Sequence, residues 1–283
     1  MKLIIESGAT KSDWVVVSDA GQQVARLSAS GMNISSMPFS AIEATIADAC
    51  RRLKGQNIAV EALYMYTAGV VTESIRTSLT QTFRGHFCGA EVEILDDMTA
   101  AVRATCGHSA GIVAIVGTGS NSCLFDGEKI VKKVYSGGFI LGDEGSAAAL
   151  GRMFVADLLK GLIPKYIADD FTARYGYDYA AIVERVYHST SPAAFLGSLA
   201  PFILEYYDDD YIRRYLRGIH NAQTTTRACA LKQYDVASFP IGVVGGFGNA
   251  LKDIFTRVAE QEGVTISRFV SAPIEELIKY HTI

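Results

Sequence analysis

The sequence lacks the patterns of several large protein classes. No apolar run among its 283 residues approaches the roughly 18 residues that cross a bilayer, and the start of the chain turns polar at Glu6. We therefore expect no membrane association and neither a signal nor a transit peptide. Lysine and arginine number 26 against 30 acidic residues, and no basic cluster is dense enough to predict nucleic-acid binding.

Cysteine is scarce and scattered. The five cysteines are odd in number and contain no CxxC pair, so the spacings of a disulfide scaffold, a zinc ribbon and an iron–sulfur cluster are missing. Free thiols are typical of a reducing compartment, and we expect a cytoplasmic protein. The phosphate-binding signatures GxxxxGK[ST] and GxGxxG are absent as well.

What is present is typical of a globular α/β protein with a repeat. Apolar residues make up 49% and charged residues 20%, which is enough for one large or two modest domains. The repeated order is strand, polar loop, strand, turn and strand, over 3–5, 6–13, 14–17, 19–21 and 22–27, and again over 111–116, 117–121, 122–125, 126–127 and 128–134. This repeat predicts two α/β domains built on one plan.

Helices and further strands are predicted between and after the two repeats. In the first half they are a helix over 38–53, a strand over 62–66, a helix around 75–83, a strand over 91–95 and a helix over 98–106. In the second half they are a long helical stretch broken by prolines, a strand over 239–244, a helix over 250–258, a strand over 265–270 and a helix from Pro273.

Three glycine-containing loops could hold a nucleotide. Gly8-Ala9-Thr10 and Gly117-Thr118-Gly119-Ser120 each lie between two predicted strands, where backbone N–H groups can converge on an oxyanion. The alternative is an ordinary hairpin, but two matched loops could hold a polyphosphate from both sides. The segment 245–249 follows a strand and opens a helix, so it either accommodates a base or is a glycine-assisted turn.

Acidic residues at element ends have two possible roles. Asp96 and Asp97 follow the strand over 91–95, so they could cap a helix, accept a proton from a substrate hydroxyl or bind Mg²⁺. Asp143 and Glu144 lie in a glycine-rich turn and could cap a helix or bind sugar hydroxyls. Asn33 could likewise be a cap or a ligand residue.

These motifs resemble those of the actin/hexokinase superfamily, and within it the BadF/BadG/BcrA/BcrD-type ATPases and the N-acetylglucosamine kinases grouped with them. The matching segments are 6–12, 95–101, 117–121, 142–147 and 245–246. The resemblance implies an α/β fold of two duplicated ribonuclease H-like (actin-like ATPase) domains, 1–109 and 110–283, with a nucleotide cleft between them. The last helix could pack back on the first domain.

The resemblance also implies the function and the residues that perform it. The expected activity is that of an ATP-dependent kinase that phosphorylates an amino sugar, with N-acetylglucosamine at its 6-hydroxyl as the first choice, in a homodimeric protein. Asp97 would be the general base, and Glu6 would contact Mg²⁺ through water. The expected ATP-binding residues are Gly8, Thr10, Lys11, Gly117, Thr118, Gly119, Ser120, Gly245, Gly246 and Asn249, and the expected sugar-binding residues are Asn33, Asp97, Gly137, Gly138 and Asp143.

Some positions depart from the family pattern, and other functions stay open. The first loop reads Ser7-Gly8-Ala9-Thr10 in place of the usual Gly-Gly-Gly-Thr, and Glu6 stands where many relatives have Asp. The alternatives are an N-acetylmuramic acid/N-acetylglucosamine kinase of cell-wall recycling, an ATPase that activates a redox partner, and a non-catalytic sugar sensor. The absence of a cysteine cluster motif argues against the activator. The two loops together with Asp97 argue against the sensor.

Overall fold

The chain divides into two compact units. One unit comprises Met1–Gly107 and Ala272–Ile283, and the other comprises His108–Ser271. The computed structural model describes residues 1–8, 11–32, 34, 37–55, 58–69, 72–189, 191–219 and 231–282. Thr10 and Asn33, two of the predicted ligand residues, lie outside the described residues.

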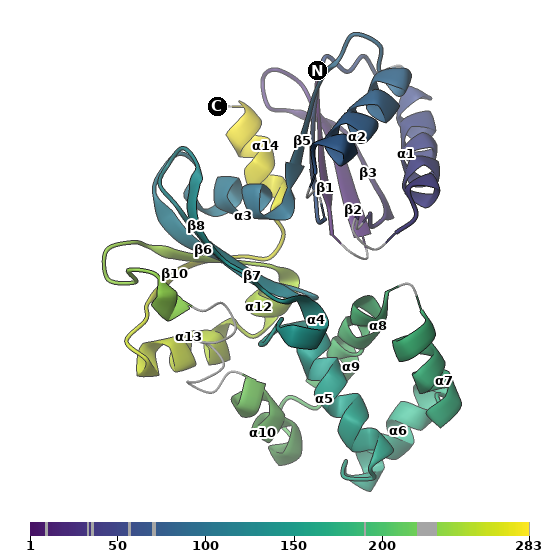
Figure 1. The fold of residues 1–283 in the computed structure, drawn as a ribbon, viewed down its shortest axis with the longest axis vertical. Coiled ribbons are helices and arrows are strands. Elements are labelled where there is room, and N and C mark those ends of the chain that lie inside the picture. Colours follow the sequence, from purple (N-terminus) through teal and green to yellow (C-terminus); the bar gives the residue numbers. More distant parts are fainter. Residues whose placement is uncertain are drawn as a thin grey trace. The chain divides into compact units, whose positions relative to one another are not determined.

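The first unit contains a mixed five-stranded sheet in the order β3-β2-β1-β4-β5. β1 pairs antiparallel with β2 and parallel with β4, and β5 continues the parallel part. The strands are β1 (Lys2–Ser7), β2 (Lys11–Val17), β3 (Gln23–Ser30), β4 (Ala62–Thr67) and β5 (Glu91–Asp96). The helices are α1 (Phe39–Lys54), α2 (Glu73–His86), α3 (Asp97–Cys106) and α14 (Ile274–Thr282) (Figure 1).

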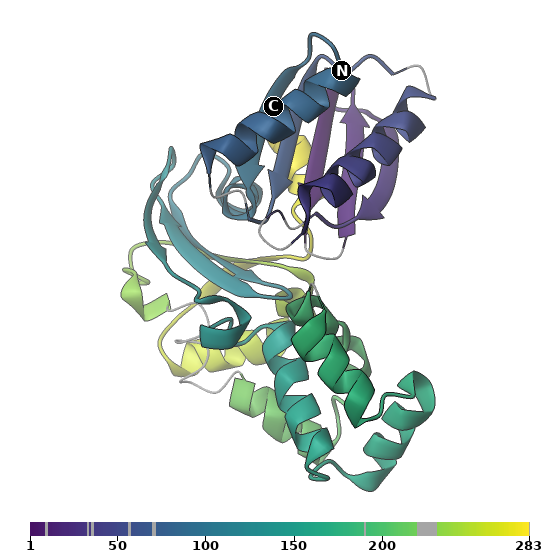
Figure 2. The ribbon, with the colours of Figure 1, turned by 45° about the vertical axis from the view of Figure 1, so that its right-hand side comes forward.

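Alternate residues of β1 pack on opposite faces of this sheet. Leu3 and Ile5 belong to the core that also holds the buried side chains of α1 and α2. Ile4 belongs to a second cluster, which contains Ile274 and Leu277 of α14. Figure 2 shows α1 and α2 over one face, with α14 behind the sheet. Because helices cover both faces, β1 is apolar without interruption from Leu3 to Ile5.

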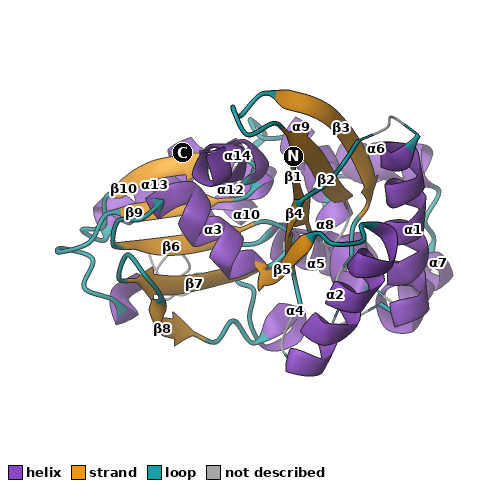
Figure 3. Ribbon diagram, turned by 90° about the horizontal axis from the view of Figure 1, so that it is seen from above, coloured by secondary structure: helices purple, strands orange, loops and turns teal. Residues whose placement is uncertain are grey.

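The second unit repeats this sheet. Its order is β10-β9-β6-β7-β8 (Figure 3). β7 pairs antiparallel with both β6 and β8, whereas β9 pairs parallel with both β6 and β10. The strands are β6 (Gly111–Val116), β7 (Ser120–Phe125), β8 (Ile130–Val134), β9 (Ile241–Val244) and β10 (Ile266–Val270). The equal strand orders confirm the fold of two duplicated α/β domains that the sequence repeat predicts.

Helices of the second unit surround a core rich in phenylalanine. Phe154, Phe171 and Phe202 are almost fully buried and lie with their ring centroids 5.3–5.9 Å apart. The helices are α4 (Gly138–Leu141), α5 (Ala147–Leu159), α6 (Lys165–Tyr175), α7 (Tyr179–Val183), the π-helical turn Glu184–His188, α8 (Pro192–Ser198), α9 (Ala200–Glu205), α10 (Asp210–Ile219), the 3-10 turn Leu231–Gln233, α12 (Gly246–Ala250) and α13 (Lys252–Gln261). The prediction of a single helix over 250–258 is wrong, because the helix is interrupted at Leu251, between α12 and α13.

Among the described residues, both membrane-spanning helices and clustered metal ligands are absent. In that part of the chain, no helix has the length and apolarity needed to cross a membrane. The same residues contain no cluster of three or more His, Cys, Asp or Glu side chains that could hold a metal ion.

Candidate functional site

The first glycine loop connects β1 to β2, and Gly8 and Lys11 are its described ends. The backbone N–H of Gly8 donates to the carbonyl of Lys11 at 3.0 Å. Ser7, which is buried, accepts a hydrogen bond from the backbone N–H of Met32 at 2.8 Å. This loop is therefore anchored both to β2 and to the segment that follows β3.

Carboxylates gather at the end of β1. Glu6 lies opposite Asp13 in the β1–β2 register, and the charge of Asp97, the first residue of α3, also acts on it. Burial, followed by the charges of Asp13 and Asp97, raises the pKa of the Glu6 carboxyl from 4.5 to about 7, and the charge of Lys11 partly opposes this rise. Glu6 therefore exchanges its proton near neutral pH.

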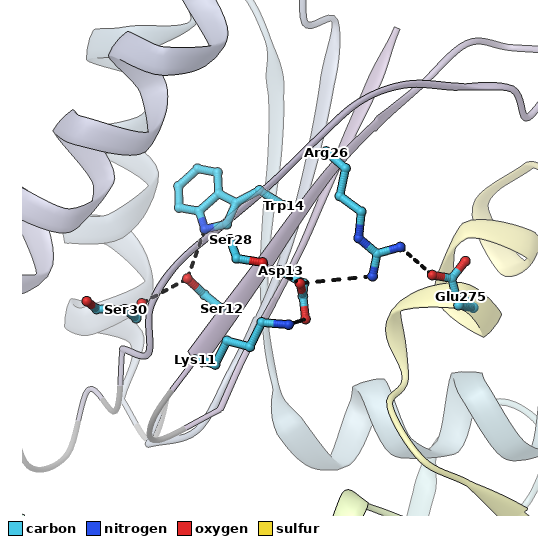
Figure 4. A network of polar contacts seen from close by, with 8 residues as sticks. All are labelled: Lys11, Ser12, Asp13, Trp14, Arg26, Ser28, Ser30 and Glu275. Atoms are coloured by element: carbon cyan, nitrogen blue, oxygen red, sulfur yellow. Dashed lines mark hydrogen bonds and ion pairs between the residues drawn. The ribbon is translucent and has the colours of Figure 1, made fainter.

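Asp13 is the centre of a polar network in the first unit (Figure 4). The Nζ atom of Lys11 lies 3.0 Å from its carboxylate, and the hydroxyl of Ser28 donates to it at 3.0 Å. Arg26 lies 4.0 Å from Asp13 and 2.5 Å from Glu275 of α14. Asp13 is 7% exposed, and the sequence analysis missed it, although a single acid at the start of a β-branched run was the available signal.

Asp96 and Asp97 have separate positions in the structure. The Asp96 carboxylate caps α3, because it accepts hydrogen bonds from the backbone N–H of Thr99 at 2.7 Å and from the Thr99 hydroxyl at 2.5 Å. Asp97 lies in the first turn of the helix. Capping thus accounts for Asp96, and the role of Asp97 as a base stays a prediction.

The second glycine loop consists of Gly117, Thr118 and Gly119. The backbone N–H of Gly117 donates to the carbonyl of Gly119 at 2.9 Å. Ser120 was predicted to lie in this loop, but it is the first residue of β7, where it pairs with Val116. The loop is therefore a three-residue connection between antiparallel strands.

The N-terminus of α5 holds this loop. The backbone N–H groups of Ala147 and Ala148 donate to the carbonyls of Gly117 and Thr118 at 2.9 and 3.1 Å. The next N–H group of the helix donates to the hydroxyl of Ser146, its N-cap. These first N–H groups, which a helix leaves unpaired, are thus used inside the protein, so this helix end supports the loop.

Asp143 lies against the same loop. Its carboxylate accepts the backbone N–H of Ser120 at 3.0 Å, and burial raises the pKa of the carboxyl. Gly137 and Gly138, with φ of 76° and 68°, begin the turn that leads to it. That turn is closed by the backbone N–H of Asp143, which donates to the carbonyl of Ser136 at 3.3 Å.

The third glycine segment lies at the start of α12. Gly245 has φ of 128°, and a Cβ atom there would lie 2.3 Å from the carbonyl oxygen of Val116. The close approach to β6 therefore requires glycine, as the glycine-turn interpretation proposed. A Cβ at Gly246 would meet nothing within 4 Å, and Asn249 lies one helical turn further on. Contact of these last two residues with adenosine stays a prediction.

Within each unit, the structure brings several predicted residues together. In the first unit, Lys11 contacts both Gly8 and Asp13. The charges of Lys11, Asp13 and Asp97 all act on Glu6. In the second unit, Asp143 joins Gly119 and Ser120.

The fold and the loops define the class of protein. Two duplicated sheets, each with a glycine-containing loop between its first two strands, are the arrangement of an actin-like ATPase. The chain belongs to the BadF/BadG/BcrA/BcrD ATPase family, whose model matches residues 5–156.

Several solved structures are similar to the chain over its whole length. A candidate N-acetylglucosamine kinase from Porphyromonas gingivalis is 33% identical, over 100% of this chain and 99% of that chain, with a TM-score of 0.91. Another from Chromobacterium violaceum is 18% identical over 99% and 98% of the chains, with a TM-score of 0.74. A glucokinase of the ROK family from Streptomyces griseus, solved with glucose and AMPPNP, is 16% identical over 99% and 97% of the chains, with a TM-score of 0.59. Among curated proteins, none matches the sequence.

Proposed function

We propose that the protein transfers the γ-phosphoryl group of ATP to the 6-hydroxyl of an amino sugar, with N-acetylglucosamine as the preferred acceptor. Family membership and the kinases among its structural neighbours support an ATP-dependent carbohydrate kinase. The observation that carries the choice of acceptor is the likeness, over the whole chain and at 33% identity, to the Porphyromonas gingivalis protein.

Phosphoryl transfer depends mainly on positioning and on neutralising charge. The loops that begin at Gly8 and at Gly117 would bind the phosphates. Asp97 would accept the proton of the sugar hydroxyl as the new bond to phosphorus forms. Asp143, Gly137 and Gly138 would bind the sugar.

Mg²⁺ would be held mainly by the phosphates of ATP, with Glu6 contacting it through water. The carboxylate oxygens of Glu6 and Asp13 at the end of β1 are the kind of ligand that this ion prefers. When bound, the ion supplies positive charge that offsets the charge of the phosphates.

The test is a coupled ADP-release assay with Mg-ATP over a panel of amino sugars and hexoses, with a control that contains no sugar. We expect release that depends on sugar and is fastest with N-acetylglucosamine. Release without any sugar would favour the activating ATPase, and nucleotide binding with no release would favour the sensor.

The Asp97→Asn variant tests the base. We expect its kcat to fall by about 10²–10⁴-fold while ATP and sugar still bind, because the amide cannot accept the proton. Asp96→Asn is the matched control, since asparagine is as good an N-cap as aspartate and kcat should stay near that of the wild type. A near-normal kcat in Asp97→Asn would remove this residue from the mechanism.

A further inference from the structure

In the second unit, the loop expected to bind phosphate is hydrogen-bonded to the turn expected to bind sugar. The backbone N–H of Ser120 donates to Asp143 Oδ1 at 3.0 Å, and the Ser120 hydroxyl donates to the carbonyl of Glu144 at 2.9 Å. The first two N–H groups of α5 donate to the loop carbonyls of Gly117 and Thr118. The turn expected to bind sugar thus contacts the loop expected to bind phosphate through both side chain and backbone.

The backbone at Asp143 is left-handed, and its carboxylate contacts the loop. Asp143 has φ of 56°, and among the described residues no other non-glycine residue has a positive φ. Left-handed backbone is costly for residues with a side chain and persists where surrounding contacts impose it. Here Asp143 donates its N–H to Ser136, and its carbonyl accepts the N–H of Ser146 at 3.2 Å.

The loop is shaped to receive this carboxylate. A Cβ atom at Gly119 would lie 2.9 Å from Asp143 Oδ2 and 3.1 Å from Oδ1. Any residue other than glycine at position 119 would therefore displace the carboxylate or the loop. By contrast, a Cβ at Gly117 would meet nothing within 4 Å. Gly119 thus meets a steric demand that comes from Asp143.

We propose that Asp143 is a positioning residue for ATP: its carboxylate holds the N–H of Ser120 and so fixes the Gly117–Gly119 loop in the conformation that binds phosphate. This inference deepens the proposed kinase function and rests on it. It adds to sugar binding a second role for the same side chain. Because the loop depends on the carboxylate at all times, nucleotide affinity depends on Asp143 even when no sugar is present.

The test measures binding of a non-hydrolysable ATP analogue with Mg²⁺ by calorimetry, in the absence of sugar. Asp143→Gly removes the carboxylate and suits the positive φ, so the turn itself is retained. Asp143→Asn keeps an oxygen that can accept the Ser120 N–H, and asparagine tolerates left-handed backbone. We expect Asp143→Gly to weaken analogue binding about tenfold and Asp143→Asn to stay within about threefold of the wild type.

Asp126→Gly is the matched control. The Asp126 carboxylate also accepts backbone N–H groups in a turn of the second unit, between β7 and β8. Its removal should leave analogue affinity unchanged. Thermal unfolding of every variant separates loss of binding from loss of fold.

A double-mutant cycle gives a second measurement. Gly119→Ala should weaken analogue binding by displacing the carboxylate, and the same change should cost less in the Asp143→Gly background, where that steric conflict is gone. Equal costs in the two backgrounds would overturn the steric part of the proposal.

The outcomes for the positioning role and for the kinase function can be distinguished. Wild-type affinity in Asp143→Gly without sugar, or an equal loss in the Asn and Gly variants, would overturn the positioning role and leave the kinase function standing. A wild-type protein that binds no nucleotide, or that shows no sugar-dependent turnover, would overturn the proposed function itself.

Discussion

At the level of single residues, Glu6 makes the free energy of unfolding depend on pH. Its pKa is raised from 4.5 to about 7 by burial and by the carboxylates of Asp13 and Asp97. The folded protein therefore binds this proton more tightly than the unfolded chain does. The contribution to the free energy of unfolding is fully present below about pH 4.5 and is lost as the pH rises through about 7.

We expect Glu6→Gln to remove this loss. Urea unfolding in buffers without Mg²⁺ or nucleotide gives the stability of the variant relative to the wild type at each pH. This relative stability should be higher at pH 8 than at pH 5. Glu43→Gln in α1, which changes an exposed carboxylate, is the control and should shift little at either pH. A wild type and a Glu6→Gln variant with parallel pH profiles would contradict the raised pKa.

Neighbouring glycines at the start of α12 have different structural requirements. We expect Gly245→Ala to destabilise the second unit, because its φ is 128° and the added Cβ would lie 2.3 Å from the Val116 carbonyl oxygen. Gly246→Ala should unfold at the wild-type temperature, since its Cβ enters open space, yet it should bind ATP more weakly if this residue lies against adenosine. Thermal unfolding and ATP-analogue binding check the pair, and unchanged ATP affinity in Gly246→Ala would remove it from the site.

At the scale of elements, local patterns predict much of the architecture. Each opening hairpin follows from apolar runs on either side of a glycine-containing loop. The opposition of Glu6 and Asp13 follows from the register of β1 and β2, which pair outward from Ser7 and Ser12. The contact between Asp143 and Ser120 could not be predicted, because it joins residues 23 positions apart and depends on a positive φ that local sequence does not specify at Asp143. The break at Leu251 was equally hidden, since apolar spacing continues across it.

Helix α14 is held in the first unit partly by His281. Its ring stacks on Tyr64 with centroids 3.8 Å apart, and its Nε2 atom lies 2.7 Å from the hydroxyl of Tyr66. Burial, followed by the charges of Arg103 and Lys2, lowers the pKa of His281 from 6.5 to about 4. The unfolded chain therefore takes up this proton more readily than the folded protein does.

The stability that the first unit gains from this neutral imidazole should be present above about pH 6.5 and lost as the pH falls toward 4. We expect His281→Phe, which can keep the ring contact but cannot titrate, to lose less stability than the wild type between pH 7.5 and pH 5. Urea unfolding at the two pH values measures this difference. His188→Phe, at an exposed position of the second unit, should follow the wild type, and an unchanged slope for His281→Phe would argue against the lowered pKa.

At the scale of the whole molecule, the chain passes from the first unit to the second after Gly107 and returns at Ala272. The sequence repeat could predict the duplication, because local sequence patterns indicate the strands of each sheet. It could not assign the last helix to a unit, since the amphipathic pattern of α14 fits either core, and only the family resemblance suggested its return. The structure divides the chain after Gly107, and the boundary between residues 109 and 110 stays a prediction.

Because α14 belongs to the first unit, a substitution in the core of this helix should destabilise the first unit. Leu277 is fully buried in the cluster with Ile4, Val15 and Val17, so Leu277→Ala should destabilise that unit by about 2–5 kcal/mol. Hydrogen exchange should accelerate in β1 and β4, while β6 and β9 keep their wild-type protection, because the second unit has its own core. Leu162→Ala, at an exposed site of the second unit, should leave hydrogen exchange in both sheets unchanged. Equal acceleration in both sheets would mean that the two units unfold as one cooperative body.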